Sequence, residues 1–153
     1  MAGGHPGLTG EGPPAVAVRP AGASDTQDAI RLLAQLGYDR TADSVADDLR
    51  TGAAGRVHVA VAGGRVIGLI AVSVRRQFHW GAPTASVDAL VVDGANRSRG
   101  AGAILLETAI GQAASDGCIL VELHSNRRRR RAHQFYKRHG FQGTSTYFVK
   151  PLR

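Results

Sequence analysis

The sequence predicts a single α/β domain of the mixed (α+β) kind, built around one central β-sheet. Short strand-like apolar segments are interleaved along the chain with segments of helical periodicity. A paired-glycine turn indicates an antiparallel hairpin, whereas a strand followed by a glycine-rich loop and a helix is typical of parallel strands. The chain has 153 residues, of which 43% are hydrophobic, and this suits one domain with one core.

The first half of the chain is predicted to hold a strand, two helices and a β-hairpin. Ser24 or Asp25 is suited to cap the first helix, and Gly37 ends it. Gly63-Gly64 separates two apolar runs, as in a tight hairpin. In chain order the elements are a strand at Ala15–Ala21, a helix ending at Leu36, a helix at Ala42–Arg50, and two strands within Arg56–Arg76.

The second half is predicted to alternate strands with helices. A glycine-rich loop leads into a helix whose apolar residues cover more than a narrow stripe, so this helix is expected to be largely buried. A later helix places Ala132, Phe135, Tyr136 and His139 on one face, and Gly140 stops it. The elements are a strand at Thr84–Val92, a helix within Ala95–Gly117, a strand at Cys118–Ser125, the helix ending at His139, and a last strand at Ser145–Leu152.

The N-terminal segment Met1–Pro14 has neither a basic start nor an apolar centre, so it is not typical of a secretory signal. Its glycine and proline content predicts a disordered leader, which leaves residues 15–153 for the domain. Cys118 is the single cysteine and cannot form a disulfide within the chain, which favours a cytoplasmic location. No stretch approaches the roughly 20 apolar residues of a membrane-spanning helix, so we expect no membrane partner.

The positive charge of the chain, +7 overall, is concentrated near its end. Residues 119–153 contain seven arginines and two lysines against Glu122, and five of the arginines are consecutive, at Arg127–Arg131. Consecutive helical side chains point all around the axis, so we expect one or two of the five to contact a single anion. A wholly solvated basic face is the alternative. Nucleic-acid binding is a weaker interpretation, because no aromatic residues are interleaved with the arginines.

The segment Arg97–Gly102 is a glycine-rich turn between a predicted strand and a predicted helix. Its residues are Arg97, Ser98, Arg99, Gly100, Ala101 and Gly102. Glycines let backbone N–H groups approach a ligand closely, and the start of a helix offers unpaired N–H donors and partial positive charge. The turn is therefore suited to hold an anion, although a tight turn that serves packing alone is the alternative. It matches neither a Walker A motif nor the dinucleotide-binding fingerprint.

Two motifs at a consistent separation give a more specific indication. They are Val91-Val92 with Arg97, Gly100, Gly102 and Leu105-Leu106, and then Ala132, Tyr136 and Gly140-Phe141. In this pattern the chain resembles small bacterial members of the GCN5-related N-acetyltransferase (GNAT) superfamily, over roughly Ala15–Leu152 and most strongly over Val87–Phe141. The resemblance implies a mixed, splayed sheet flanked by helices. It also implies direct transfer of an acetyl group from acetyl-CoA to a primary amine in a ternary complex.

The resemblance also implies where acetyl-CoA binds as a cosubstrate. Its phosphates are expected at the turn Arg97–Gly102. The carbonyl oxygen of the thioester is expected to meet a backbone N–H near the end of the preceding strand, at Leu90, Val91 or Val92. Many family members carry an asparagine seven residues before the tyrosine that matches Tyr136, but this chain has Arg129 there. A bacterial subgroup with the same departure implies coenzyme-binding roles for Asn126 and Arg129.

Acyl transfer to an amine needs a deprotonated amine, a donor for the carbonyl oxygen and a proton for the leaving thiolate. The resemblance implies that Tyr136 supplies this proton; a tyrosine that only packs in the core is the alternative. Asp88 is a carboxylate in an otherwise apolar strand, where a charge is unfavourable unless it lines a cleft. It is therefore the first candidate for the base, and Glu122 is the second. Either carboxylate could act through a water molecule.

The acceptor site is expected to be built from the first helices and from a loop between two strands. The candidate residues are Tyr38, Phe78, His79 and Trp80. A Trp80 that packs over the sheet, or that is buried in a homodimer, is the alternative. The acceptor itself, a small-molecule or peptide amine, is not identified by the sequence.

Two other functions fit some of the same residues. One is a non-catalytic sensor that binds acyl-CoA, and the other is an arginine-rich nucleic-acid-binding protein. The enzyme is the preferred interpretation, and no nucleic-acid partner is expected. We expect no metal site either, because the six histidines show no paired ligand spacing and one cysteine adds nothing.

Overall fold

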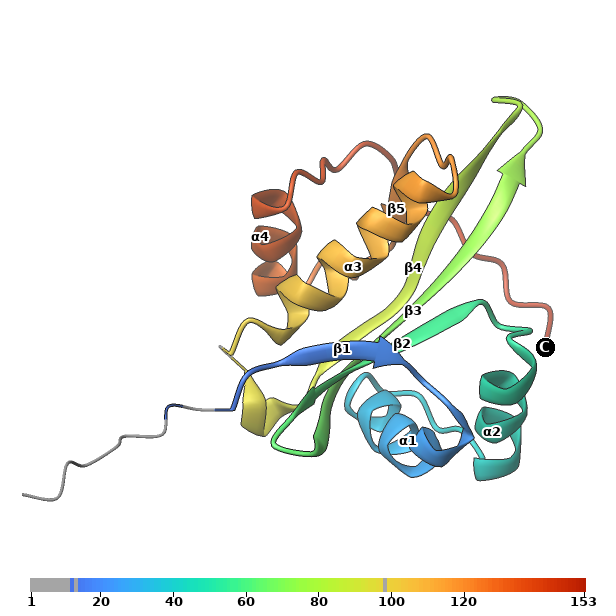
Figure 1. The fold of residues 1–153 in the computed structure, drawn as a ribbon. Helices are drawn as coiled ribbons and strands as arrows, with labels where there is room; N and C mark the ends of the chain where they lie inside the picture. Colours follow the sequence, from blue (N-terminus) through green and yellow to red (C-terminus); the bar gives the residue numbers. More distant parts are fainter. Residues whose placement is uncertain (1–11, 13, 98) are drawn as a thin grey trace, which may run out of the picture.

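The computed structural model describes residues 12, 14–97 and 99–153 of the chain (Figure 1). The predicted leader lies outside the described residues except for Gly12 and Pro14, and Ser98 of the glycine-rich turn also lies outside them. The elements are β1 (Ala17–Pro20), the 3-10 helix η1 (Ala23–Asp25), α1 (Thr26–Gln35), α2 (Ala42–Thr51), β2 (Arg56–Ala62), β3 (Arg65–Gln77), β4 (Ala82–Val92), the 3-10 helix η2 (Gly94–Asn96), α3 (Ala101–Ser115), β5 (Val121–Leu123) and α4 (Arg130–Arg138).

Five strands form one mixed sheet in the order β1-β2-β3-β4-β5. The pairs from β1 to β4 are antiparallel, whereas β4 and β5 are parallel. The turn between β2 and β3 contains Gly63 and Gly64 at φ values of 58° and 75°, a left-handed conformation that glycine adopts without strain. The predictions of a mixed sheet and of this hairpin are confirmed.

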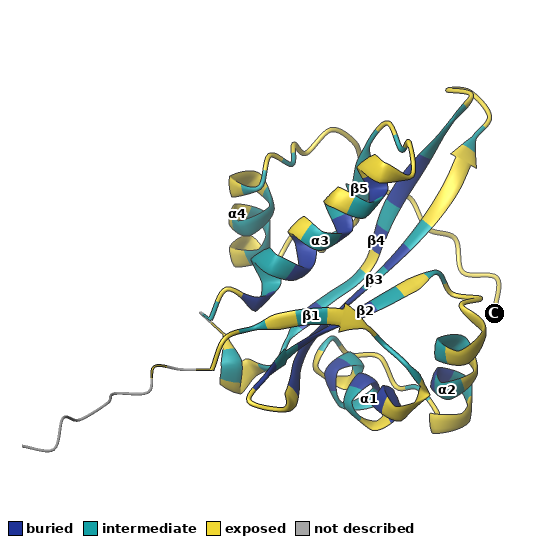
Figure 2. Cartoon of the chain, in the orientation of Figure 1, coloured by how far each residue is buried: buried dark blue, intermediate teal, exposed yellow. Residues whose placement is uncertain are grey.

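Helices cover both faces of the sheet (Figure 1). α3 and α4 lie over one face, above a core that includes Ile70, Leu105 and Leu106. α1 and α2 lie over the other face, above a second core that includes Leu32 and Val59. In Figure 2 the buried residues of α1 and α3 are on the sides that face the sheet. This is the helix-flanked sheet that the sequence predicts.

β4 contains a bulge at Asp88. Ala71 and Val72 of β3 are paired with Ala89 and Val87, so Asp88 is an extra residue without a partner in β3. Residues two apart on a regular strand face the same side. Here Val87 packs into the core under α3, whereas Ala89 packs against the core under α1. The bulge therefore reverses the alternation of β4, and both halves of the strand still bury apolar side chains.

β4 and β5 separate after a short contact. Their pairing runs from Ala85 with Val121 to Val87 with Leu123 and ends there. Beyond Val87, the second edge of β4 has no strand partner among the described residues. Its outward N–H and C=O groups are therefore available to a ligand. The predicted splaying of the sheet is present at this point.

The prediction of a last strand is wrong, because Ser145–Leu152 forms neither helix nor strand. Tyr147, Phe148 and Val149 are 66%, 88% and 67% exposed. Consecutive residues of a strand point to opposite faces, so a strand here could not bury all three of these side chains against one face of the sheet. The preceding strand is also shorter than the predicted Cys118–Ser125, since β5 has three residues.

The prediction that a side chain caps the first helix is also wrong. Asp25 occupies the N-cap position of α1, which starts at Thr26, but its side chain makes no hydrogen bond that caps this helix, and Ser24 lies in the preceding 3-10 helix. The Asp25 carboxylate instead accepts hydrogen bonds from Arg19 at 2.8 and 2.9 Å and from the Gly22 N–H at 2.8 Å. The hydrogen bond from Arg19 is the main reason that the pKa of Asp25 lies below its ordinary value. The carboxylate thus links β1 to the segment before α1.

Replacing Leu105 with alanine should lower the free energy of unfolding by about 2–5 kcal/mol. Its side chain is fully buried (0% exposed) and lies against Gly68 of β3. If Gly68 carried a Cβ, that atom would lie 3.1 Å from Leu105 Cδ1. The substitution therefore leaves a cavity between α3 and the sheet. Phe78→Ala is the control, since Phe78 is 102% exposed and its loss should change stability little. Urea unfolding followed by circular dichroism measures both variants, and equal losses would contradict this description of the core.

Candidate active site

A cavity of about 420 Å³ lies where β4 and β5 separate. Its walls come from the loop after α1, from β4 and β5, from the chain that follows β5, and from α4. The lining residues are Leu36, Tyr38, Val87, Asp88, Ala89, Leu90, Leu123, His124, Ser125, Asn126, Arg128, Arg129 and Tyr136. Residues that are far apart in the sequence, and that the sequence analysis assigns to catalysis, coenzyme and acceptor, therefore share one cavity.

A larger cavity, of about 690 Å³, lies between α3 and the start of β2. The buried His58 ring lines it and is 3.0 Å from Gln112 of α3, measured between their Nε2 atoms. Burial, with a smaller effect from the nearby Arg56 charge, lowers the pKa of His58. None of the predicted site residues lines this cavity, so we base the active-site assignment on the smaller one.

Asp88 contributes a carboxylate to the β4 wall of the cavity at the end of β4–β5 pairing. The Ser86 hydroxyl donates a hydrogen bond to Asp88 Oδ1 at 3.0 Å. The Asp88 side chain is exposed, so its charge is solvated rather than buried in the sheet. The bulge thus explains how a carboxylate is tolerated within an apolar strand.

The chain that follows β5 brings polar groups to the opposite wall. The Asn126 side-chain oxygen accepts a hydrogen bond from the Arg128 N–H at 2.9 Å, and its carbonyl accepts one from the Arg129 N–H at 3.0 Å. Asn126 therefore forms a turn that leads into α4. It does not cap this helix, whose N-cap, Arg129, has no side-chain hydrogen bond. Of the run Arg127–Arg131, Arg128 and Arg129 line the cavity.

Tyr136 lies on the inward face of α4, as the helical spacing predicts. Its ring packs edge-on against Phe135 and Phe141, with centroid distances of 5.4 and 5.9 Å. Burial raises the pKa of the Tyr136 hydroxyl, and the nearby charge of Arg129 partly opposes this effect. The phenol is consequently neutral at physiological pH, as a proton donor must be.

The turn before α3 has the geometry of an anion-binding loop. Gly100 precedes the helix at a φ of 77°, and the first intrahelical bond runs from the Ile104 N–H to the Gly100 carbonyl at 3.1 Å. The earlier amides of the helix have no intrahelical acceptor, and the helix dipole adds partial positive charge. Arg97 is exposed beside them, and the guanidinium of Arg99 donates to the Asn96 side chain at 3.1 Å.

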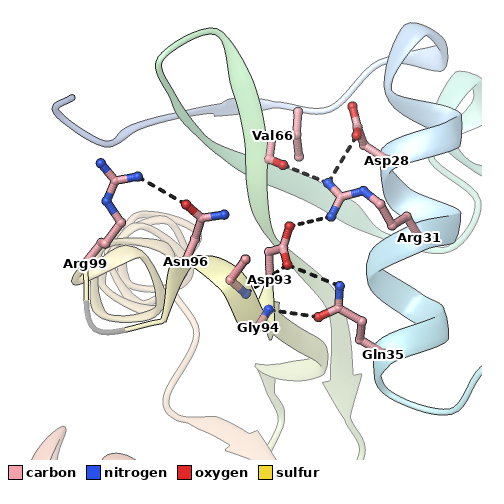
Figure 3. Close-up of polar contacts among 9 residues, drawn as sticks. Asp28, Arg31, Gln35, Val66, Asp93, Gly94, Asn96 and Arg99 are labelled. Atoms are coloured by element: carbon pink, nitrogen blue, oxygen red, sulfur yellow. Dashed lines mark hydrogen bonds and ion pairs between the residues drawn. The ribbon is translucent and has the colours of Figure 1, made fainter. Parts of the chain in front are cut away.

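A polar network holds the start of this turn against α1 (Figure 3). Arg31 donates to Asp93 Oδ2 at 2.6 Å and to the Val66 carbonyl at 2.9 Å. The side chain of Gln35 accepts from the Gly94 N–H at 3.0 Å and donates more weakly to Asp93 at 3.4 Å. The pKa of Asp93 is lowered, mainly by the Ala95 N–H and also by Gln35 and Arg31.

Some predicted site residues lie away from the cavity. Phe78, His79 and Trp80 are at the exposed turn of the β3–β4 hairpin, which extends beyond the helices in Figure 1. Glu122 is paired with Ser86 and is not part of the lining. The assignment of these residues to the site stays a prediction.

Some residues that the structure brings to the site are not predicted from the sequence. Leu36, His124 and Ser125 line the cavity, and Arg31 and Gln35 support the turn before α3. The spacing of Arg31 and Gln35 by four residues is the one available signal, since it puts two polar side chains on one side of a predicted helix.

The described part of the chain holds neither a metal-binding group nor a membrane-spanning helix. No three His, Cys, Asp or Glu side chains are grouped so that they could hold a metal ion there. Within the same residues, no helix has the length and apolar character needed to cross a bilayer.

Comparisons with known proteins are consistent with this geometry. The family model described as Acetyltransferase (GNAT) family matches residues 28–141. An aminoalkylphosphonate N-acetyltransferase from Salmonella typhimurium is 30% identical over 146 residues, covering 91% of this chain and 93% of the relative. A transcriptional regulator from Bacillus halodurans has a TM-score of 0.82 at 21% identity, covering 90% of this chain and 100% of that one. An acetyltransferase from Trypanosoma brucei has a TM-score of 0.77 at 23% identity, with the same coverage. The two structural likenesses show the fold alone.

Replacing Asp93 with asparagine should destabilise the protein at neutral pH by about 1 kcal/mol, since charged hydrogen bonds are lost but Arg31 is partly exposed. The folded pKa of Asp93 lies below the ordinary 3.8. The Asp93 carboxylate therefore contributes its full stabilisation of the folded state above the ordinary pKa of 3.8. This stabilisation is lost as the pH falls through the lower pKa of the folded protein.

The gap in unfolding free energy between wild type and Asp93→Asn should consequently close on acidification. Urea unfolding between pH 7 and pH values below about 4 measures this gap. Asp47→Asn is the control, because the pair of Asp47 and Arg50 is 63% and 69% exposed. A gap for Asp93→Asn that does not change with pH would contradict the assigned role.

Proposed function

The chain belongs to the acetyltransferase (GNAT) family and is an N-acetyltransferase, and from this premise we propose that it moves the acetyl group of acetyl-CoA directly to a primary amine in a ternary complex. The observation that carries the proposal is the cavity between β4 and β5. A carboxylate, a neutral phenol and an unpaired strand edge meet there. Membership of an enzyme family also favours turnover over the alternatives of a silent acyl-CoA sensor and a nucleic-acid-binding protein.

The residues before α3 fit the phosphates of acetyl-CoA. A Cβ built at Gly100 would meet nothing within 4 Å, so the space beside the first turn of the helix is open. Gly102, in contrast, packs closely, since a Cβ there would lie 3.5 Å from Val92 and 3.6 Å from Phe135. The first glycine thus leaves room for a ligand, and the second lets α3 approach β4 and α4. Arg97 and the helix amides supply the positive charge.

The residues of the cavity can complete the chemistry in one step. The amine nitrogen forms a bond to the thioester carbon as the carbon–sulfur bond breaks. The proton of an alkyl ammonium, whose ordinary pKa is about 10, leaves to Asp88, directly or through water. An outward N–H of β4 near Leu90–Val92 donates to the carbonyl oxygen as its charge develops. Tyr136 gives its proton to the departing thiolate. The acylated nitrogen then loses its second proton to solvent, and Tyr136 regains one from solvent.

Asp88 remains the first candidate for the base. It lines the cavity together with Tyr136, whereas Glu122 is outside the lining, so Glu122 stays the second candidate. The same carboxylate would attract a cationic amine before deprotonation. The acid and the base therefore come from different elements, α4 and β4, and approach the bound donor from different sides.

Leu36 and Tyr38 line the same cavity as Asp88 and would form its acceptor end. The curated relative is named for aminoalkylphosphonates, so we propose a small amine of this class as the first acceptor to test. Phe78, His79 and Trp80 lie outside the cavity lining, so their contact with the acceptor stays a prediction. A cytoplasmic location is part of the same proposal, since the single Cys118 suits a reducing compartment.

Gly100→Asp should abolish the rise in melting temperature that acetyl-CoA gives the wild type, since a negative side chain would occupy the phosphate site. Gly100→Asn is the matched control. It has the same size and bears the same strain at a φ of 77°, but it adds no charge. Differential scanning fluorimetry with acetyl-CoA measures the shift. An equal shift for wild type and Gly100→Asp would mean that the phosphates bind elsewhere.

Tyr136→Phe should lower kcat by about 10²–10⁴-fold and leave the affinity for acetyl-CoA nearly unchanged. The lower end is expected, because a thiolate leaves readily without help. Since burial raises the pKa of Tyr136, the wild type should keep its activity to alkaline pH, and the variant should be slow throughout. Release of free thiol with 2-aminoethylphosphonate as acceptor gives kcat at each pH. A variant with normal kcat would make Tyr136 a packing residue.

A further inference from the structure

The hydroxyl of Ser125 is buried and lacks a hydrogen-bond partner within the described part of the chain. Ser125 follows β5 at the place where β5 and β4 separate, and it lines the active-site cavity. Among the described residues, it is the only buried side-chain nitrogen or oxygen atom without a hydrogen-bond partner. The hydroxyl is therefore unlike the other buried polar groups of the molecule.

Other buried hydroxyls are satisfied within the fold. Thr84 Oγ1 accepts a hydrogen bond from Gln77 at 3.2 Å, and Thr26 Oγ1 donates to the Ala23 carbonyl at 2.6 Å. A buried hydroxyl without a partner destabilises the folded state, so native proteins rarely keep one without a reason such as a ligand. The position of Ser125 in the lining of a cavity points to a partner that enters from outside the chain.

The position also indicates which part of a ligand this partner is. The anion-binding turn at Arg97–Gly102 lies outside the cavity lining, whereas Asp88 and Tyr136 lie in it. A donor whose phosphates bind at the turn and whose thioester reaches the catalytic pair must pass its connecting arm through the cavity. In acetyl-CoA that arm is pantetheine, and its two amides are the hydrogen-bonding groups nearest the thioester.

We propose that Ser125 is a coenzyme-binding residue whose hydroxyl forms a hydrogen bond with an amide of the pantetheine arm, opposite the unpaired edge of β4. The inference rests on the proposed function, since it takes acetyl-CoA as the donor. Tyr38 and Tyr136 also bring hydroxyls to the lining, but no hydrogen bond joins either of them to Ser125. A role in orienting Tyr136 would require such a bond in the protein alone.

The test compares wild type with Ser125→Ala for two donors, acetyl-CoA and S-acetylpantetheine, which lacks the nucleotide and its phosphates. The variant should bind both donors about 5- to 30-fold more weakly, because an amide of the arm loses its partner in a buried site. The KM for each donor should rise by the same factor, with kcat nearly unchanged. The melting temperature of the protein alone should stay equal or rise, because an unsatisfied group has been removed.

Two control variants give the opposite patterns. Thr84→Val removes a buried hydroxyl that has a partner, so it should lower the melting temperature and leave donor binding unchanged. Gly100→Asp should weaken acetyl-CoA but not S-acetylpantetheine, because the latter has no phosphate at the turn. These patterns separate a contact with the arm from a role in stability and from a contact with the phosphates.

Three results for Ser125→Ala would overturn the inference. They are unchanged affinity for both donors, a loss confined to acetyl-CoA, and a lower melting temperature without loss of affinity. If the wild type binds both donors and the variant binds them equally well, the inference fails and the proposed function stands. If the wild type binds neither donor, the proposed function fails and the inference fails with it.

Discussion

The parallel pairing of β4 with β5 stops at Val87, and beyond this residue the edge of β4 that faces away from β3 must find hydrogen-bond partners other than a strand. The bulge at Asp88 is at the same place and changes which face each later residue of β4 occupies. The cavity, the unpaired strand edge and the exposed carboxylate all follow from this short interval. A continuous β4–β5 ladder would close the cavity and bury the groups that acyl transfer requires.

The loop that follows β4 is held from the other side of the sheet. Asp93 accepts hydrogen bonds from Arg31 and from the Ala95 N–H, and Gln35 accepts from the Gly94 N–H. α1 therefore holds in place the residues at which the chain leaves β4 and turns toward the first amides of α3. Since the loop after α1 carries Leu36 and Tyr38 of the cavity, this helix and its following loop contact both the turn before α3 and the cavity.

Local chemistry made much of the fold and part of the site predictable from the sequence. The hairpin at Gly63-Gly64, the turn at Arg97–Gly102 and the inward face of α4 each depend on residues close together in the chain. Features that depend on distant partners were not predictable. The bulge follows from the register with β3, and the ion pair of Arg31 with Asp93 spans 62 residues.

The last strand was predicted from composition, but a strand also needs a partner edge that its residues can pair with. The same limit applies to the site, where spacing and resemblance selected Tyr136 but gave no reason to assign Ser125. Its assignment depends on a hydroxyl that is buried and unpaired, and this cannot be read from residue types.

The two cores have a wider consequence, because they lie on opposite faces and share no buried residue. Under the proposed function, the α1–α2 layer could therefore be exchanged between relatives to change the acceptor, while the layer of α3 and α4 is kept. Such chimeras would need to retain Arg31 and Gln35, whose side chains join the two layers.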